Sequence, residues 1–132
     1  MSDLGALRQV SQYAADLDRA ITFYRDVLGL RMIARFGPIA FFDLDGVRLF
    51  IEQVDGDEHE RGSVLYFAVA DIRAARAELQ ERGVVFADDP HVLFADTEGM
   101  FGEAGEEEWM TFFQDTEGNV LALSAREFPG QV

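Results

Sequence analysis

The sequence of 132 residues contains neither cysteine nor lysine. Without cysteine the chain has no disulfide framework, no thiolate metal site and no cysteine nucleophile. All 11 basic residues are therefore arginine, and with 25 acidic residues the formal net charge is −14. A field of that sign repels phosphate backbones and anionic lipids, so we expect no nucleic-acid or membrane partner. The acidity fits either a cation-rich habitat or an ordinary solvated surface.

Long apolar runs are also missing. No uninterrupted apolar stretch approaches the roughly 18 residues that a membrane span requires, and the first residues lack the basic and apolar segments of a signal peptide. The sequence also lacks a phosphate-binding glycine loop, a serine nucleophile elbow and a His-Glu-x-x-His motif. We therefore expect a soluble cytoplasmic protein outside these common enzyme classes.

Apolar residues, in contrast, are plentiful. They make up 48% of the chain and include 12 phenylalanines, which is enough for a hydrophobic core. The length is typical of one domain. We expect a single domain over residues 1–132.

An internal repeat is the clearest feature of the sequence. Residues 15–20 read Ala-Asp-Leu-Asp-Arg-Ala, and residues 70–75 read Ala-Asp-Ile-Arg-Ala-Ala. After each copy, apolar residues recur at the three-and-four spacing of an amphipathic helix. Asp16 and Asp71 stand where helix N-caps are expected, and Gly29 and Gly83 where the helices end.

The repeat continues into paired strands. Residues 41–46 resemble residues 112–118, because in both segments two phenylalanines precede an acidic turn that ends in glycine. Such turns are typical of β-hairpins. The repeating unit is therefore strand, helix, strand and hairpin, present at about residues 5–56 and 63–127 with a linker at about 57–62. This pattern predicts an α+β fold of two βαβββ units.

The second copy contains a longer connection than the first. The extra residues, about 96–108, are rich in glycine and glutamate and include the run Glu106-Glu107-Glu108. We expect a long loop here, which is either functional or simply mobile. The acidic run is either a solvated face or a functional element, which would be a lid or a cation-binding lip.

Two segments resemble a known family. Residues 15–30 resemble the first-helix pattern A-D-x-x-R-A-x-x-F-Y-x-x-V-L-G-L of the vicinal oxygen chelate superfamily, and residues 112–123 are similar to its F-x-D-P-D-G-x-x-x-E-L signature. With the middle repeat, the resemblance spans about residues 7–127. It implies two βαβββ units that form a curved mixed sheet around a cup, the glyoxalase/bleomycin resistance/dihydroxybiphenyl dioxygenase fold, and it favours a homodimer.

The resemblance also implies four positions for metal ligands. They fall on Gln9, on Val64, on Ala122 and nearest Leu49, with Glu52 a few residues further along. A divalent ion needs several lone-pair donors, and valine and alanine offer none. We therefore expect no metal and no other cofactor, although Gln9 resembles an oxygen ligand of some glyoxalase I enzymes.

Two residues are candidates for catalysis. Alternation in the strand at 47–52 places Arg48, Phe50 and Glu52 on one face, and a carboxylate among apolar side chains becomes a stronger base. His91 precedes an apolar strand, and imidazole suits proton transfer near neutral pH. Their alternatives are structural, a surface pair of Glu52 with Arg48 and a strand-capping His91. His59 lies in the linker and receives no role.

Candidate ligand-binding residues are Gln9, Phe50, Trp109 and Phe113. For Trp109, the only tryptophan, the alternative is packing in the sheet core, where large aromatic side chains usually lie. Two functions remain open. The first is a metal-free binder of a small molecule, of the bleomycin-resistance kind, and its acidic rim favours cationic ligands. The second is a glyoxalase-like lyase or an epimerase-like isomerase that abstracts a proton beside a carbonyl; an extradiol dioxygenase is disfavoured because it needs an iron site.

Overall fold

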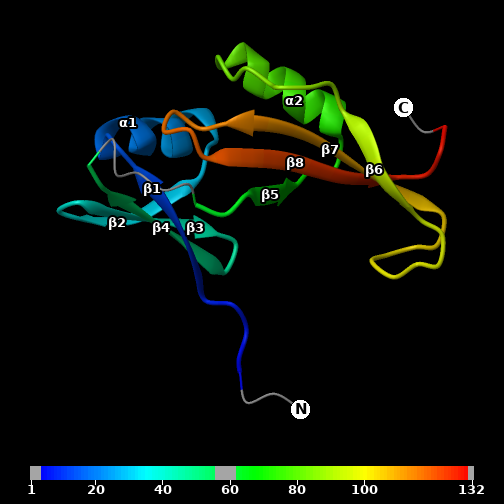
Figure 1. Ribbon diagram of the computed structural model, residues 1–132, viewed down its shortest axis with the longest axis horizontal. Helices are drawn as coiled ribbons and strands as arrows, with labels where there is room; N and C mark the ends of the chain where they lie inside the picture. The colour runs from blue at the N-terminus through cyan, green and yellow to red at the C-terminus, as the bar shows by residue number, and fades with distance from the viewer. Residues whose placement is uncertain (1–3, 56–61, 131–132) are drawn as a thin grey trace. The chain divides into compact units, whose positions relative to one another are not determined.

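The computed structural model describes residues 4–55 and 62–130, and Figure 1 shows their helices and strands. His59 and most of the expected linker, residues 57–61, lie outside the described residues. No helix within the described residues is long and apolar enough to cross a membrane.

The first half of the chain forms a four-stranded mixed sheet with one helix. Its elements are β1 (Gln9–Ala14), α1 (Leu17–Thr22), a π-helical turn η1 (Phe23–Val27), β2 (Arg31–Phe36), β3 (Ile39–Leu44) and β4 (Val47–Gln53). The strand order is β1-β4-β3-β2, in which β1 runs parallel to β4 and the other pairs are antiparallel.

The second half repeats this arrangement. Its elements are β5 (Leu65–Ala68), α2 (Ile72–Glu81), β6 (His91–Asp96), β7 (Glu106–Gln114) and β8 (Val120–Glu127). The order β5-β8-β7-β6, with β5 parallel to β8, matches the first sheet strand for strand. The predicted α+β fold of two βαβββ units is confirmed.

The chain divides into two compact units that do not follow the repeat at every residue. The first unit contains residues 1–63 and also residues 115–119, the turn that joins β7 to β8. The second contains residues 64–114 and 120–132. The turn of the second hairpin thus belongs to the first unit.

Both helices begin after the predicted aspartate caps, and the helical segments, η1 included, end shortly before the predicted glycines. The carboxylates of Asp16 and Asp71 accept hydrogen bonds from main-chain N–H groups of the first helical turn. Gly29 and Gly83 follow the helical segments with φ of +76° and +96°. A left-handed residue there closes the helix, and glycine adopts it without the steric penalty of a Cβ.

In each unit, only one face of the sheet packs against the unit's helix. On the first sheet, alternate residues such as Leu49 and Ile51 are completely buried on the helix side. On the second sheet, Leu121 and Leu123 of β8 are buried in the same way. Successive strand residues point to opposite faces. The residues between them therefore form the opposite faces, which we call the first and second helix-free faces.

The long loop of the second unit is shorter than the sequence suggests. β6 ends at Asp96 and β7 already begins at Glu106, so the loop covers residues 97–105. The run Glu106-Glu107-Glu108 therefore lies in a strand, and its predicted place in the loop is wrong. These residues are strand residues paired with β6 and β8, and the Arg126 guanidinium of β8 forms ion pairs with Glu106 and Glu108.

Candidate functional site

Three of the predicted site residues lie on the first helix-free face. In the strand register, Gln9 lies beside Arg48, and Glu52 lies beside Tyr13. Phe50 occupies the row between them. Gln9 is exposed, whereas Phe50 and Glu52 are half-buried. The predicted alternation of β4 is thus correct, and Glu52 forms no surface ion pair with Arg48 within the described residues.

Phenylalanine rings surround the centre of this face. The ring centroid of Phe41 lies 5.4 Å from that of Phe50 and 6.0 Å from that of Phe36. The Arg48 guanidinium lies 5.9 Å from the Phe41 centroid. Leu49, the residue nearest the expected ligand position, is completely buried on the other side of the sheet, so Phe50 takes that place on the open side.

The second helix-free face carries a row of three rings. Phe112 of β7 contacts Tyr66 of β5 edge to face, with ring centroids 6.2 Å apart. On its other side, Phe112 stacks with His91, at 6.2 Å and an interplanar angle of 27°. Tyr66 is 54% exposed, and the side chain of His91 is 45% exposed. These rings therefore remain open to a ligand.

Polar contacts with Asp88 and Asp89 hold the imidazole of His91. Its Nδ1 lies 3.1 Å from the main-chain oxygen of Asp89 and 3.5 Å from a carboxylate oxygen of Asp88. The other carboxylate oxygen of Asp88 accepts hydrogen bonds from the buried Thr111 hydroxyl and from the Phe112 N–H, both at 2.9 Å. Hydrogen bonds from β7 therefore hold the Asp88 carboxylate that lies beside His91.

Ala122 lies in the middle of the ring row. In the strand register it pairs with Tyr66 on one side and with Phe112 on the other. By the same pairing, Phe50 is its counterpart on the first sheet, between Ser11 and Phe41. The expected metal-ligand position on β8 is thus an alanine, and the equivalent position on β4 is a phenylalanine.

Two candidate ligand-binding residues, Phe113 and Trp109, do not lie on the second helix-free face. Phe113 is only 2% exposed, and its ring packs 5.0 Å from that of Phe86 in the core. Trp109 lies beneath the Arg73 guanidinium of α2, 4.8 Å from the ring centroid. Both side chains point to the helix side. Phe112, the neighbour of Phe113 in β7, faces the other side of the sheet.

Further along the second helix-free face, Arg126 gathers three carboxylates. Its guanidinium binds Asp96 at 2.7 Å, Glu106 at 3.0 Å and Glu108 at 3.3 Å. The N–H groups of Phe101 and Met100 donate to Asp96, which outweighs the effect of burial and, with Arg126, lowers the pKa of Asp96 to about 2. This cluster, in which one guanidinium faces three carboxylates, holds the loop at residues 97–105.

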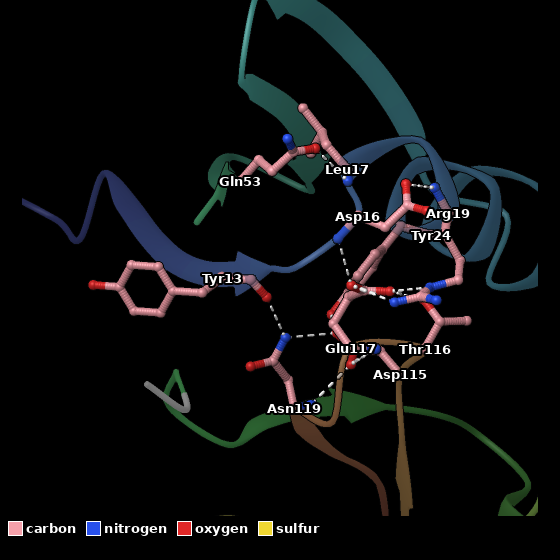
Figure 2. A network of polar contacts seen from close by, with 10 residues as sticks. All are labelled: Tyr13, Asp16, Leu17, Arg19, Tyr24, Gln53, Asp115, Thr116, Glu117 and Asn119. Carbon is pink, nitrogen blue, oxygen red and sulfur yellow. Dashed lines mark hydrogen bonds and ion pairs between the residues drawn. The ribbon is translucent and has the colours of Figure 1, made fainter. Parts of the chain in front are cut away.

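The turn at 115–119 forms the densest polar network of the first unit (Figure 2). Asp115 accepts the Tyr24 hydroxyl at 2.5 Å and the Asn119 side-chain amide at 2.8 Å. Glu117 binds the Arg19 guanidinium and the Asp16 N–H, and Asn119 donates to a main-chain oxygen of β1. The acidic, glycine-containing turn predicted as hairpin chemistry is therefore a structural clamp. Its side-chain partners lie about a hundred residues away.

Buried groups in this network are strongly perturbed. Burial, followed by the neighbouring charge and hydrogen bond of Asp115, raises the pKa of Tyr24 well above its usual value. Burial opposes the charge of Glu117, yet hydrogen bonds from Arg19, Asp16 and Thr116 outweigh it and lower the pKa of Glu117 to about 2. The carboxylate stays charged and the phenol stays protonated. Neither group is poised for proton transfer.

Comparisons with known proteins now give the family. The family model of the Glyoxalase/Bleomycin resistance protein/Dioxygenase superfamily matches residues 6–123. The chain belongs to this superfamily. No curated protein sequence matches the chain.

Solved structures of the superfamily share the fold. A glyoxalase/bleomycin resistance protein/dioxygenase from Alicyclobacillus acidocaldarius is 24% identical, with a TM-score of 0.67 and coverage of 95% of this chain and 94% of that one. An antibiotic-binding protein from a Streptomyces species is 21% identical, with a TM-score of 0.68 and coverage of 95% and 98%. A lactoylglutathione lyase from Agrobacterium tumefaciens is 18% identical, with a TM-score of 0.66 and coverage of 94% and 96%. These similarities show the fold and leave the activity open.

The usual metal positions of the superfamily do not fit an ion in this chain. Ala122 and Val64 carry no lone-pair donor, and the outward residue beside Leu49 is Phe50. Across residues 4–55 and 62–130, no three histidine, aspartate or glutamate side chains gather as metal ligands do. Gln9 alone is not a site.

Proposed function

We propose that the protein binds a small aromatic molecule on its second helix-free face, without a metal ion. The observation that carries this proposal is the row of His91, Phe112 and Tyr66, which lie in ring contact yet remain accessible. Aromatic pairs in offset or edge-to-face contact gain stability beyond simple burial, so a planar ligand extends the row favourably. The antibiotic-binding function of the Streptomyces neighbour is in keeping with a binding role.

The place of the row supports the same conclusion. Ala122, at the position where the superfamily's signature carries its glutamate, lies between Tyr66 and Phe112. Ala122 is completely buried, and its small side chain lets the Tyr66 and Phe112 rings on either side of it come into contact, so rings occupy the place of metal ligands. Binding pockets are commonly lined in this way, with apolar and aromatic side chains and a few polar groups that set the orientation. His91 supplies such a polar group.

A dye-binding experiment tests the proposal. A neutral naphthylamine dye, which fluoresces more strongly in apolar surroundings, is titrated into the protein. We expect Phe112→Ala to weaken binding about tenfold, because the central ring contributes both contact area and stacking. Phe36→Ala is the matched control, since it removes an exposed ring from the first sheet. Equal losses in the two variants, or no binding to the native protein, would contradict the proposal.

Metal analysis tests the second part of the proposal. We expect protein purified without chelators to contain far less than one zinc, nickel or iron ion per chain, and dye binding to be unchanged by EDTA. A stoichiometric ion would sink this part and would direct attention to Gln9, Glu52 and His91 as unconventional ligands.

Proton abstraction beside a carbonyl is the second candidate function, and the polar contacts of His91 favour it. Its Nδ1 faces two oxygen acceptors, Asp89 and Asp88, an arrangement that leaves Nε2 available as a base. Glu52 on the first helix-free face is the alternative base. Deuterium exchange at the α-carbon of simple α-hydroxyketones measures this activity. Exchange by the native protein that disappears in His91→Ala or Glu52→Gln would favour an isomerase or lyase over a pure binder.

We also propose a homodimer, as the superfamily resemblance implies. Light scattering coupled to size exclusion gives the mass directly. A mass of one chain at micromolar concentration would contradict it.

A further inference from the structure

We propose that Asp88 and Asp89 hold His91 in the Nδ1-protonated tautomer, so that Nε2 offers its lone pair to an aromatic ligand that carries an O–H or N–H donor. The tautomer follows from the contacts of His91 alone. The ligand class rests on the proposed binding function, because it requires a planar molecule on the ring row. A phenol is the simplest ligand that combines a ring with a suitable donor.

The two groups that face Nδ1 accept hydrogen bonds and donate none. The Asp89 carbonyl oxygen, 3.1 Å from Nδ1, has no hydrogen to give. The facing oxygen of Asp88 belongs to a carboxylate whose other oxygen already accepts two hydrogen bonds. A neutral imidazole carries one N–H, and it is most stable where that N–H meets these acceptors. Free histidine prefers the Nε2-protonated form. The two acceptors beside Nδ1 therefore reverse this tautomer preference in His91.

The ring plane is fixed as well as the tautomer. Stacking on Phe112 sets the imidazole at 27° to the phenyl ring, and the Phe112 N–H holds the same Asp88 that faces Nδ1. Within the part of the chain that the structure describes, no hydrogen-bond partner of Nε2 is found. A ligand that stacks along the row thus meets an acceptor at a defined place.

Asp88 and Asp89 have separable roles. Asp89 contributes its main-chain oxygen, while its carboxylate is almost fully exposed and pairs with Arg76. Asp88 contributes its carboxylate. Asp88→Asn keeps an oxygen for Thr111 and Phe112 but turns a donating amide toward Nδ1, whereas Asp89→Asn leaves the main-chain acceptor in place. The second variant is therefore a matched control for the first.

Nitrogen NMR of the free protein tests the tautomer. Protein labelled with ¹⁵N is measured at about pH 8, where an ordinary imidazole is neutral, and the signals of His91 are assigned by their loss in His91→Phe. We expect the protonated nitrogen to be Nδ1 in the native protein and in Asp89→Asn, with a smaller Nδ1-protonated fraction in Asp88→Asn. Protonation at Nε2 in the native protein would overturn the inference.

A pair of ligands tests the donor requirement. β-Naphthol and its methyl ether share the same rings, and only the naphthol donates a hydrogen bond. We expect the native protein to bind the naphthol roughly three- to tenfold more tightly, the difference that one hydrogen bond supplies, and His91→Phe to bind both equally. Equal binding by the native protein overturns the donor requirement. Failure of both ligands to bind contradicts the proposed function too, while the NMR result still decides the tautomer.

Discussion

Glu117 shows how a single buried carboxylate ties distant segments together. Its two oxygens accept from the Arg19 guanidinium and from the N–H of Asp16, and its side chain is fully buried. Those bonds form only in the folded chain, and they are stronger to the charged carboxylate than to the protonated acid. The energy they contribute therefore depends on pH.

We predict that this contribution disappears in acid. The folded-state pKa of Glu117 is about 2, against an ordinary value of 4.5. A depressed pKa stabilises the folded state above the ordinary value, and this stabilisation is lost as the pH falls from 4.5 towards 2. Glu117→Gln should cost about 1–3 kcal/mol of unfolding free energy at neutral pH.

Urea unfolding of both proteins from neutral pH downward provides the measurement. The gap between them should be constant near neutrality and should narrow in the acid range. Glu98→Gln, in an exposed loop, is the control and should show no such gap. Parallel curves for native protein and Glu117→Gln throughout the acid range would refute the assignment.

The candidate site was partly readable from single residues. Alternation along β4 correctly separates Phe50 and Glu52 from Leu49. The same reasoning fails at Phe112 and Phe113, because two adjacent phenylalanines suit either face of a strand and only the pairing with β8 sets which is outward. The contacts of His91 with Asp88 depend on the path of the chain before β6, which no local pattern indicates.

At the level of elements, the loop between β6 and β7 depends on a glycine without a left-handed φ. A Cβ at Gly102 would lie 2.8 Å from Nε of Arg126 and 3.0 Å from one of its terminal nitrogens. Arg126 has little freedom to move, because three carboxylates hold its guanidinium. The close approach of loop and arginine therefore needs a residue without a side chain.

We predict that Gly102→Ala destabilises the protein by about 1–3 kcal/mol, the usual cost of forcing atoms into a packed site. Thermal and urea unfolding measure the loss. Gly5→Ala is the control, because a Cβ there meets nothing within 4 Å. Unchanged stability of Gly102→Ala would mean that the loop shifts freely and that Arg126 does not anchor it.

Elements with strong local signals were predicted well. The aspartate caps and the closing glycines define both helices, and the two-residue turn at Asp45-Gly46, with φ of +56° and +102°, defines the first hairpin. The π-helical turn η1, which has an i to i+5 hydrogen bond from the Leu28 N–H to the Phe23 oxygen, has no such signal. The start of β7 was missed because a triple glutamate has low strand propensity, which pairing with Arg126 overrides.

For the whole molecule, the charge of −14 is the dominant electrostatic fact. Excess like charge repels itself more strongly in a compact chain than in an expanded one. Many arginines are already paired, yet exposed ion pairs contribute little to stability. We therefore predict that the unfolding temperature rises by several degrees between about 10 mM and about 0.5 M sodium chloride, as the screening length falls below about 5 Å.

Scanning calorimetry over that range of salt measures the effect. Near the isoelectric point of about 4.3 the net charge vanishes, and the salt dependence should shrink with it. A falling unfolding temperature at neutral pH would show that the paired arginines outweigh the net repulsion.

The fold of the whole chain could be predicted from the sequence because the same pattern of elements occurs in it twice. Two copies of a cap, a helix and a glycine-closed hairpin leave few other arrangements. The sequence does not predict that the turn at 115–119 belongs to the first unit. The hydrogen bonds that place it there, from Tyr24 to Asp115 and from Arg19 to Glu117, span 91 and 98 residues.

That turn has a consequence for how the protein is made. A ribosome delivers residues 1–63 well before it delivers Asp115, so the first unit leaves the exit tunnel without the clamp of Figure 2. Tyr24 and Arg19 must wait for partners that are still being translated. Amino-terminal segments usually fold first during synthesis. In this protein the unit that contains residues 1–63 is completed only after residues 115–119 have been made.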